Sequence, residues 1–396
     1  MHVQDKHETR KREILENAFR IWGESGYSST SLSGLAGALG MTKQALYRYF
    51  SSKESLEQAM EDLVIDRYLR FSSRLADKAA ASPADEIPAV YVAESMTFLR
   101  DAECYMAFLS FRYRKSESNP PAVADTLARV EELLRSRCGL PPTAMRYLNS
   151  LVFLASHQGR GKRDGAGDVD RVVRLFREGF CVGQPCQSPD FDQVLSDAAM
   201  LDYGLDGVDP VIKAVFEAVL EESSSGISVD MVARKAGMTK SSLYNYWPGK
   251  EAMLADVLAR QFDLFQDRFS DFVGSYDRPA DRLFAYPAYT GAALSRNPGV
   301  INYIQRVMAY GSDIKAHGPL MDQRYAGPIG ELVADGCLAA DPWGPRGLLG
   351  LLNLAVVMEI QHHLARGSVR IRINQGIKDI YRLFAGGTEA LRRTLS

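Results

Sequence analysis

Apolar residues recur at spacings of three and four along the first fifty positions of this 396-residue chain, as in amphipathic helices. A second short apolar stripe, Leu32 to Leu39, ends at Gly40, which can adopt the left-handed conformation that closes a helix. Two short helices joined by a glycine-containing turn predict a helix-turn-helix. The helix before them, about 10 to 24, has a stripe made of Ile14, Leu15, Ala18, Phe19 and Trp22.

A third predicted helix follows Thr42, a residue type that caps helix N-termini, and this helix has two different faces. Leu46 and Phe50 are four residues apart and are expected to pack inward. Ser51 and Glu54 have the spacing of a capping box that opens a fourth helix. The outer face of the third helix carries polar and basic side chains, as a DNA recognition helix requires: Lys43, Gln44, Tyr47 and Arg48.

The same pattern occurs twice in the chain. Residues 41–50 read MTKQALYRYF and residues 238–247 read MTKSSLYNYW, an offset of 197 residues (238 − 41). Ten of the nineteen positions from 36 to 54 are identical to their partners at this offset. Repeats of solenoid proteins have periods of tens of residues, so an offset this long indicates that a whole protomer is duplicated. The chain then replaces a homodimer with one covalent molecule.

The first copy resembles the DNA-binding domain of TetR-family transcriptional regulators. The resemblance is carried by Gly40-Met41-Thr42-Lys43-x-x-Leu46-Tyr47-x-Tyr49-Phe50-x-x-Lys53-Glu54 and by the preceding Phe19, Trp22, Gly26-Tyr27 and Leu35-Ala36. The second copy, 227–253, matches less closely, with Trp247 in place of the phenylalanine and Pro248-Gly249 in place of two serines.

The resemblance implies an all-α fold of two tandem units, each with a three-helix DNA-binding domain and a helical sensor domain, paired as an intramolecular pseudo-dimer. It also implies a repressor-like switch, in which a small molecule alters the spacing of the two recognition helices. The residues that would face double-stranded DNA are Thr42, Lys43, Gln44, Tyr47, Arg48, Tyr49 and Lys53 in the first copy, and Thr239, Lys240, Ser241, Tyr244, Asn245, Tyr246 and Lys250 in the second.

These patterns predict five segments. The DNA-binding domains span 1–57 and 209–255, here called the first head and the second head. The sensor and dimerisation domains span 58–185 and 256–396, and 186–208 is a linker that can hold a short helix at 190–202. Dimerisation in the family resembles a four-helix bundle, here 142–158 and 168–180 against 346–366 and 373–394. The apolar run from Leu348 to Met358 suits such an interface.

Charge distinguishes the two heads. The first has eight Lys/Arg and seven Asp/Glu over residues 1–57, and its basic arm contains Lys6, Arg10, Lys11 and Arg12. Residues 205–255 hold five Lys/Arg and seven Asp/Glu. Contacts between basic side chains and phosphates supply much of the affinity of a protein for DNA. The first head, which has the more positive charge, is therefore expected to bind DNA more strongly. The outward residues also differ, Gln44 against Ser241 and Arg48 against Asn245, which predicts an asymmetric operator.

The composition is typical of a soluble protein and gives no sign of a membrane protein or an enzyme. The chain is 46% hydrophobic with a net charge of −2, as in soluble globular proteins. No run reaches the roughly 18 apolar residues of a membrane helix, and no signal-peptide core occurs near position 1, so a cytoplasmic protein is expected. The five cysteines include no CxxC pair and are expected to be free thiols. No catalytic triad, phosphate loop, cofactor motif or metal spacing is found, so no enzyme is expected.

Aromatic residues gather in the middle of each sensor domain. Core packing is the ordinary role of such residues, but several tyrosines around one cavity would suit a small apolar or aromatic effector. The candidates are Phe98, Tyr105 and Phe108 in the first half, and Tyr286, Tyr289, Tyr303 and Tyr310 in the second.

Three functions remain open at this point. The leading one is a ligand-responsive repressor that binds DNA as a single-chain pseudo-dimer. Whether such chains associate further is left open. In the second, only the first head binds DNA and two chains dimerise. The third, of another class, is a small-molecule carrier or an enzyme that uses the helical cavity.

Overall fold

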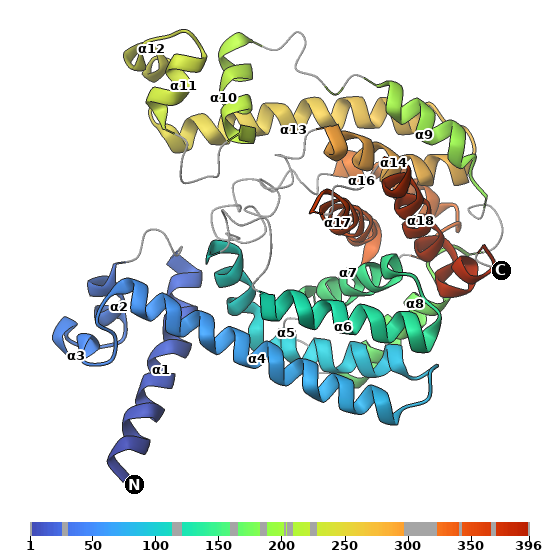
Figure 1. Cartoon of the computed structure of the whole chain (residues 1–396). Coiled ribbons are helices and arrows are strands. Elements are labelled where there is room, and N and C mark those ends of the chain that lie inside the picture. Colours follow the sequence, from blue (N-terminus) through green and yellow to red (C-terminus); the bar gives the residue numbers. More distant parts are fainter. Residues whose placement is uncertain are drawn as a thin grey trace. The chain divides into compact units, whose positions relative to one another are not determined.

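A computed structural model describes residues 2–25, 31–112, 121–158, 165–182, 188–201, 203, 209–221, 228–296, 323–339, 343–365 and 370–394. These residues form helices and no strand, apart from one isolated antiparallel bridge between Cys181 and Leu338 (Figure 1). The prediction of an all-α fold is confirmed for this part of the chain. The helices divide into two compact units, one containing Met1–Leu133 and the other Leu134–Ile304 and Ala316–Ser396.

The first unit begins with the first head. Helices α1 (His2–Ser25), α2 (Leu32–Ala38) and α3 (Lys43–Tyr47) lead into the long α4 (Lys53–Ala81). Helices α5 (Ile87–Arg112) and α6 (Pro121–Cys138) follow, and α5 packs against both α4 and α1. The predicted apolar stripes supply the core, since Ile14, Phe19, Leu35, Leu46 and Phe50 are all buried.

The expected cap of α4 lies one residue further along than predicted. Ser52, not Ser51, is the N-cap, and its hydroxyl accepts a hydrogen bond from the backbone N–H of Ser55 at 3.1 Å. The Ser55 hydroxyl in turn accepts from the backbone N–H of Ser52 at 3.0 Å. A serine can close this reciprocal box because its hydroxyl oxygen accepts the backbone N–H of Ser52, as a glutamate carboxylate would, so Glu54 is not needed.

The second head repeats this design inside the second unit. Helices α10 (Pro210–Glu221), α11 (Val229–Lys235) and α12 (Lys240–Tyr244) lead into α13 (Lys250–Gly274). Their core includes Val215, Val232, Leu243, Trp247 and Val257. The N-cap of α13 is Gly249, which makes no side-chain capping bond, so this head lacks the serine box that opens α4 in the first.

Four helices from distant parts of the sequence pack together in the second unit. Helix α7 (Pro142–Gln158) packs on α17 (Gly344–Ala365) and α18 (Arg370–Arg392), and α8 (Gly165–Glu178) packs on α18 and α7 (Figure 1). Helix α17 is long and apolar enough to cross a membrane, but 61% of its apolar window is buried inside the protein. A core helix of a soluble protein has the same properties.

Helices α14 (Pro279–Arg296) and α16 (Gln323–Ala334) complete this unit, and α14 packs against α9 (Phe191–Met200). Helix α9 lies within the segment predicted as a linker. Its Phe191 ring meets Phe284 edge-on at 4.7 Å, and its Asp197 accepts a hydrogen bond from Tyr276 at 2.9 Å. These contacts make α9 a packed part of the unit.

A buried ionic cluster joins α7 to α17. The Glu359 side chain is fully buried and accepts hydrogen bonds from Arg146 Nε at 2.6 Å and Thr143 Oγ1 at 3.1 Å. His363 Nε2 lies 3.0 Å from the same carboxylate. Gly376 of α18 covers this group, because a Cβ there would overlap the Glu359 carboxylate. Burial raises the pKa of Glu359, but the hydrogen bonds with His363 and Arg146 outweigh burial and lower it to about 2.

We expect acid to weaken this cluster. A carboxyl group whose folded pKa is depressed stabilises the fold above its unfolded pKa, and this contribution is lost as pH falls through the folded value. For Glu359 the loss should therefore occur between its ordinary pKa of 4.5 and about 2. Urea denaturation at a series of pH values in this range measures it. A double variant, Arg146→Met with Glu359→Leu, should show a flatter pH dependence; equal slopes would contradict the assignment.

Candidate nucleic-acid interface

The first recognition helix, α3, is held by its apolar side and presents its polar side to solvent. Leu46 and Phe50 are 1% and 3% exposed, which confirms their predicted inward packing. Thr42 caps the helix by accepting from the backbone N–H of Ala45 at 3.2 Å. The predicted DNA-facing side chains that lie exposed are Thr42, Lys43, Gln44, Tyr47 and Arg48, while Tyr49 and Lys53 are partly buried.

The basic arm at the start of α1 lies beside α3. The His7 ring stacks on Tyr49 with centroids 4.8 Å apart, and Lys11 Nζ lies 5.8 Å from the centroid of Phe50. Lys43 Nζ lies 5.6 Å from the ring centroid of Tyr47. A cation over an aromatic face keeps its hydrogen-bond donors available for another partner. Lys11 of α1 and Lys43 of α3 therefore both lie against aromatic rings of the segment that contains the first recognition helix.

The second recognition helix, α12, has the same frame. Thr239 accepts from the backbone N–H of Ser242 at 3.1 Å, and Leu243 is buried. The Trp247 ring, in place of Phe50, is buried and its Nε1 donates to Asp256 at 2.9 Å. The predicted DNA-facing residues that lie exposed here are Thr239, Lys240, Ser241, Tyr244, Asn245 and Tyr246, and Lys250 is partly buried.

The two helices differ in how their first lysine is paired. Lys240 Nζ forms an ion pair with Asp230 of α11 at 3.0 Å. The hydrogen bond to Asp230 and the attraction of its charge raise the pKa of Lys240. At the 197-residue offset, Asp230 corresponds to Ser33, and Lys43 makes no ion pair with any residue that the structure describes. The ammonium group of Lys240 is thus neutralised by a neighbouring carboxylate, whereas that of Lys43 is not neutralised by any described residue.

The sequence pattern predicts the polar face of each recognition helix, but Asp230 and His7 were not among the predicted residues. Both could have been found: comparing the copies residue by residue places Asp230 against Ser33, ten residues before Lys240. His7 stands one turn before Lys11 in the basic arm.

The effector candidates are only partly within the described residues. Phe98 lies buried against Tyr68 and Phe71, with ring centroids 4.7 and 4.9 Å away. Tyr286 and Tyr289 are buried among the aromatic rings of α13, and their hydroxyl groups bond to the backbone of Ile329 and Phe265. The side chains of Tyr105, Phe108, Tyr303 and Tyr310 lie outside the described residues. A role for any of these residues in effector binding remains a prediction.

The part of the chain that the structure describes holds no group of three or more His, Cys, Asp or Glu side chains placed to bind a metal ion. Features of this part that could take part in ligand binding include the exposed polar faces of α3 and α12 and a cavity lined by α1, α4 and α5.

The family described as "Bacterial regulatory proteins, tetR family" matches this chain at two places, residues 14–60 and residues 216–257. These two ranges include α2 with α3 and α11 with α12, respectively.

Several bacterial proteins are similar to this chain over less than half of its length. The transcriptional repressor AcnR of Corynebacterium diphtheriae is 27% identical over 190 residues, which cover 44% of this chain and 94% of AcnR. ComR, a transcriptional repressor of Escherichia coli, is 27% identical over 162 residues, covering 41% of this chain and 71% of ComR. The repressor Rv1474c of Mycobacterium tuberculosis is 26% identical over 156 residues, which cover 38% of this chain and 81% of Rv1474c. Each relative is therefore about as long as one of the two repeats.

Proposed function

The chain belongs to the TetR family and carries two copies of its DNA-binding domain, and from this premise we propose that it is a transcriptional repressor that acts as a single-chain pseudo-dimer. The observation that carries the proposal is the pair of recognition helices, α3 and α12, each capped by a threonine and each with an exposed polar face. Three similar proteins, AcnR, ComR and Rv1474c, are transcriptional repressors, which supports repression as the direction of control. We place its action in the cytoplasm, on double-stranded DNA, and expect no enzymatic activity.

The packing of α7 and α8 against α17 and α18 supports pairing within one chain. In a homodimer a four-helix interface of this kind would need two molecules, whereas here both helix pairs belong to one polypeptide. The mechanism we propose is control of spacing. Two recognition helices enter successive major grooves when their half-sites lie about 34–36 Å apart. A small effector can bind more tightly to a conformation in which the two helices have another spacing. It then lowers operator affinity by the difference between its binding free energies for the two conformations.

We propose that the operator is asymmetric. Glutamine can bond adenine in a bidentate way and arginine can bond guanine, so Gln44 and Arg48 read bases more strictly than Ser241 and Asn245. The half-site under α3 should therefore be the more stringent one. Selection of binding sites from random DNA tests this directly. A selected site that is a perfect palindrome would contradict it.

Removing the carboxylate that pairs with Lys240 should strengthen the second head. We expect Asp230→Ser to raise operator affinity about threefold to tenfold, because it frees one cation for a phosphate and removes one repulsive charge. The reciprocal change in the first head, Ser33→Asp, is the matched control and should lower affinity. Fluorescence anisotropy with a labelled operator at two salt concentrations measures both. If Asp230→Ser left affinity and its salt dependence unchanged, Lys240 would not contact phosphate.

The specific features of the second head also support a second candidate, in which only the first head binds DNA. Lys240 is already paired, Gly249 gives no side-chain cap, and residues 205–255 carry more acidic than basic residues. Two chains would then dimerise so that two first heads reach the operator. The double variant Tyr244→Ala, Lys250→Ala distinguishes the candidates, because it weakens DNA binding only if the second head takes part.

A further inference from the structure

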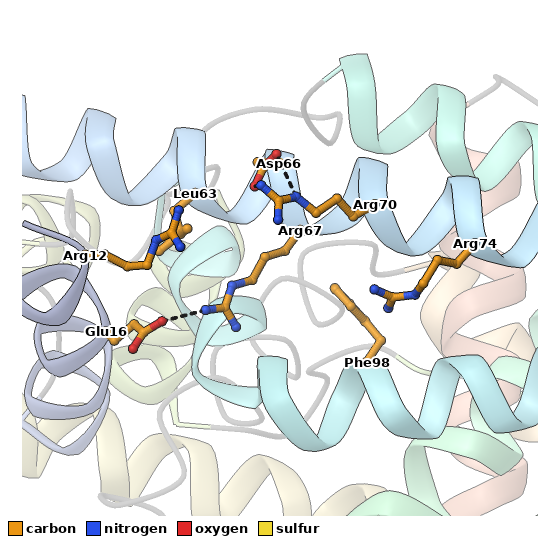
Figure 2. Close-up of a pocket in the computed structure, with 8 residues that line it drawn as sticks. All are labelled: Arg12, Glu16, Leu63, Asp66, Arg67, Arg70, Arg74 and Phe98. Carbon is orange, nitrogen blue, oxygen red and sulfur yellow. Dashed lines mark hydrogen bonds and ion pairs between the residues drawn. The ribbon is translucent and has the colours of Figure 1, made fainter. Parts of the chain in front are cut away.

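A cavity of about 250 Å³ lies in the first unit, beside the DNA-binding domain. Its walls come from α1, α4 and α5, and they are rich in arginine: Arg12, Arg67, Arg70 and Arg74 line it together with Leu63 and Phe98 (Figure 2). Pockets for drug-sized ligands span roughly 300–1,000 Å³, so this cavity suits a smaller molecule.

The four arginines are only partly neutralised. Arg67 pairs with Glu16 at 2.8 Å, and Arg70 pairs with Asp66 at 2.8 Å (Figure 2). Glu16 and Asp66 are the acidic residues of the lining, so the walls carry an excess of two positive charges. Arg12 makes no ion pair with the described residues. Arg74 makes a long contact of 3.4 Å with Glu94, whose carboxylate is also held by Lys78.

One wall is apolar and held in place. Phe98 is 8% exposed, stacks on Phe71 at 4.9 Å and meets Tyr68 edge-on at 4.7 Å. Arg12 extends from α1 toward α4, and the guanidinium group of Arg74 extends from α4 toward Phe98 (Figure 2). Guanidinium groups bind carboxylates in a bidentate way and also lie over aromatic faces. The cavity therefore combines an aromatic surface with two guanidinium groups: that of Arg12, and that of Arg74, whose contact with Glu94 is long because Lys78 also holds this carboxylate.

We propose that this cavity binds a small organic dianion with an apolar body, such as an aromatic dicarboxylate. Its two acidic groups would pair with Arg12 and Arg74, and its apolar body would contact Phe98 and Leu63. The sequence predicts a small apolar or aromatic effector, and the arginines of this cavity add two acidic groups to that description. Desolvating a dianion requires compensating positive charge. Arg12 and Arg74 supply it when the ligand replaces the long Arg74–Glu94 contact, because Lys78 still neutralises Glu94.

The site links a ligand to the first head. Arg12 belongs to α1, which packs against α2, while Arg74 belongs to α4. A dianion between them would hold Arg12 at the cavity, and Arg12 is one of the four cations of the basic arm. Because each cation withheld from phosphate weakens DNA binding, the ligand should lower operator affinity. This regulatory step rests on the proposed function, whereas the binding site itself does not.

Calorimetric titration of the full chain with phthalate, at constant ionic strength, tests the site. We expect saturable binding that Arg12→Gln and Arg74→Gln each weaken about tenfold, the effect of losing one hydrogen-bonded charge pair. The matched control is Arg129→Gln, which removes an exposed arginine of α6 that does not line this cavity and should bind as wild type does. Phthalamide, which has the same ring without the charges, should not bind measurably.

Other results would overturn the proposal. Absence of phthalate binding, equal binding of phthalamide, or equal affinities in all three arginine variants would each show that no dianion site lies here. An anisotropy titration with labelled operator separates the regulatory step. If phthalate binds as expected but operator affinity does not fall, the coupling is wrong and the site stands. If the chain binds no operator even without phthalate, the proposed function fails, and the calorimetric result is unaffected.

Discussion

Replacing Lys43 and Tyr47 together with alanine is expected to lower operator affinity about 100-fold, because each contact to a charged phosphate contributes about 1.5–3 kcal/mol. Both side chains lie exposed on α3, where Lys43 Nζ lies 5.6 Å from the Tyr47 ring centroid and keeps its donors available. Neither side chain belongs to the buried core, so the denaturation midpoint should stay unchanged. Anisotropy titration of an operator selected from random DNA measures the loss.

The second head offers a matched comparison, the variant Lys240→Ala, Tyr244→Ala. We expect a smaller loss of affinity, about tenfold, because Lys240 must first leave Asp230 before it can bind a phosphate. Equal losses from the two double variants would show that the heads are equivalent in DNA affinity. No loss from the second variant would favour the candidate function in which only the first head binds DNA.

Replacing Glu359 with glutamine is expected to lower the free energy of unfolding by about 3–5 kcal/mol, the cost of leaving a buried charge without its partner. Arg146 lies buried on α7, and Glu359 accepts from both its Nε and its Nη2, at 2.6 and 3.0 Å. Glutamine keeps the shape of the side chain but removes the charge that compensates the guanidinium group. Urea denaturation at neutral pH measures the change.

The double variant Arg146→Met, Glu359→Leu is the control for this prediction. Replacing a whole buried ion pair with apolar residues of similar volume is often neutral or stabilising, so this variant should be close to wild type in stability. If the double variant were as unstable as Glu359→Gln, the loss would come from packing around Gly376 instead of from the unpaired charge. If Glu359→Gln were as stable as wild type, Arg146 would have another compensating partner.

Much of this fold was predictable because it rests on local patterns that occur twice. The inward positions of Leu46 and Phe50 follow from a spacing of four, and the repeat at an offset of 197 residues shows that one design is used in both halves. Threonine before Lys43 and before Lys240 predicts where both recognition helices begin, and both threonines are N-caps in the structure.

The features that sequence reasoning missed depend on contacts between residues far apart. Glu359 follows an apolar run on α17, and its partner Arg146 stands 213 residues earlier, so no local pattern joins them. The arginine cavity is predictable in part. The spacing of Arg67, Arg70 and Arg74 in the sequence places them on one face of α4, whereas Arg12 joins them only through the packing of α1 in the fold. The capping box of α4 is a local exception. It lies one residue later than predicted, and the hydroxyl of Ser55 takes the acceptor role that the spacing assigns to Glu54.

The stoichiometry of the DNA complex distinguishes a single-chain pseudo-dimer from a dimer of two chains. Purified chain would be mixed with an operator selected from random DNA, and the mass of the complex measured by light scattering. We expect one chain on each duplex, with α3 and α12 of the same molecule on two half-sites. A complex of two chains on each duplex would contradict the single-chain pseudo-dimer.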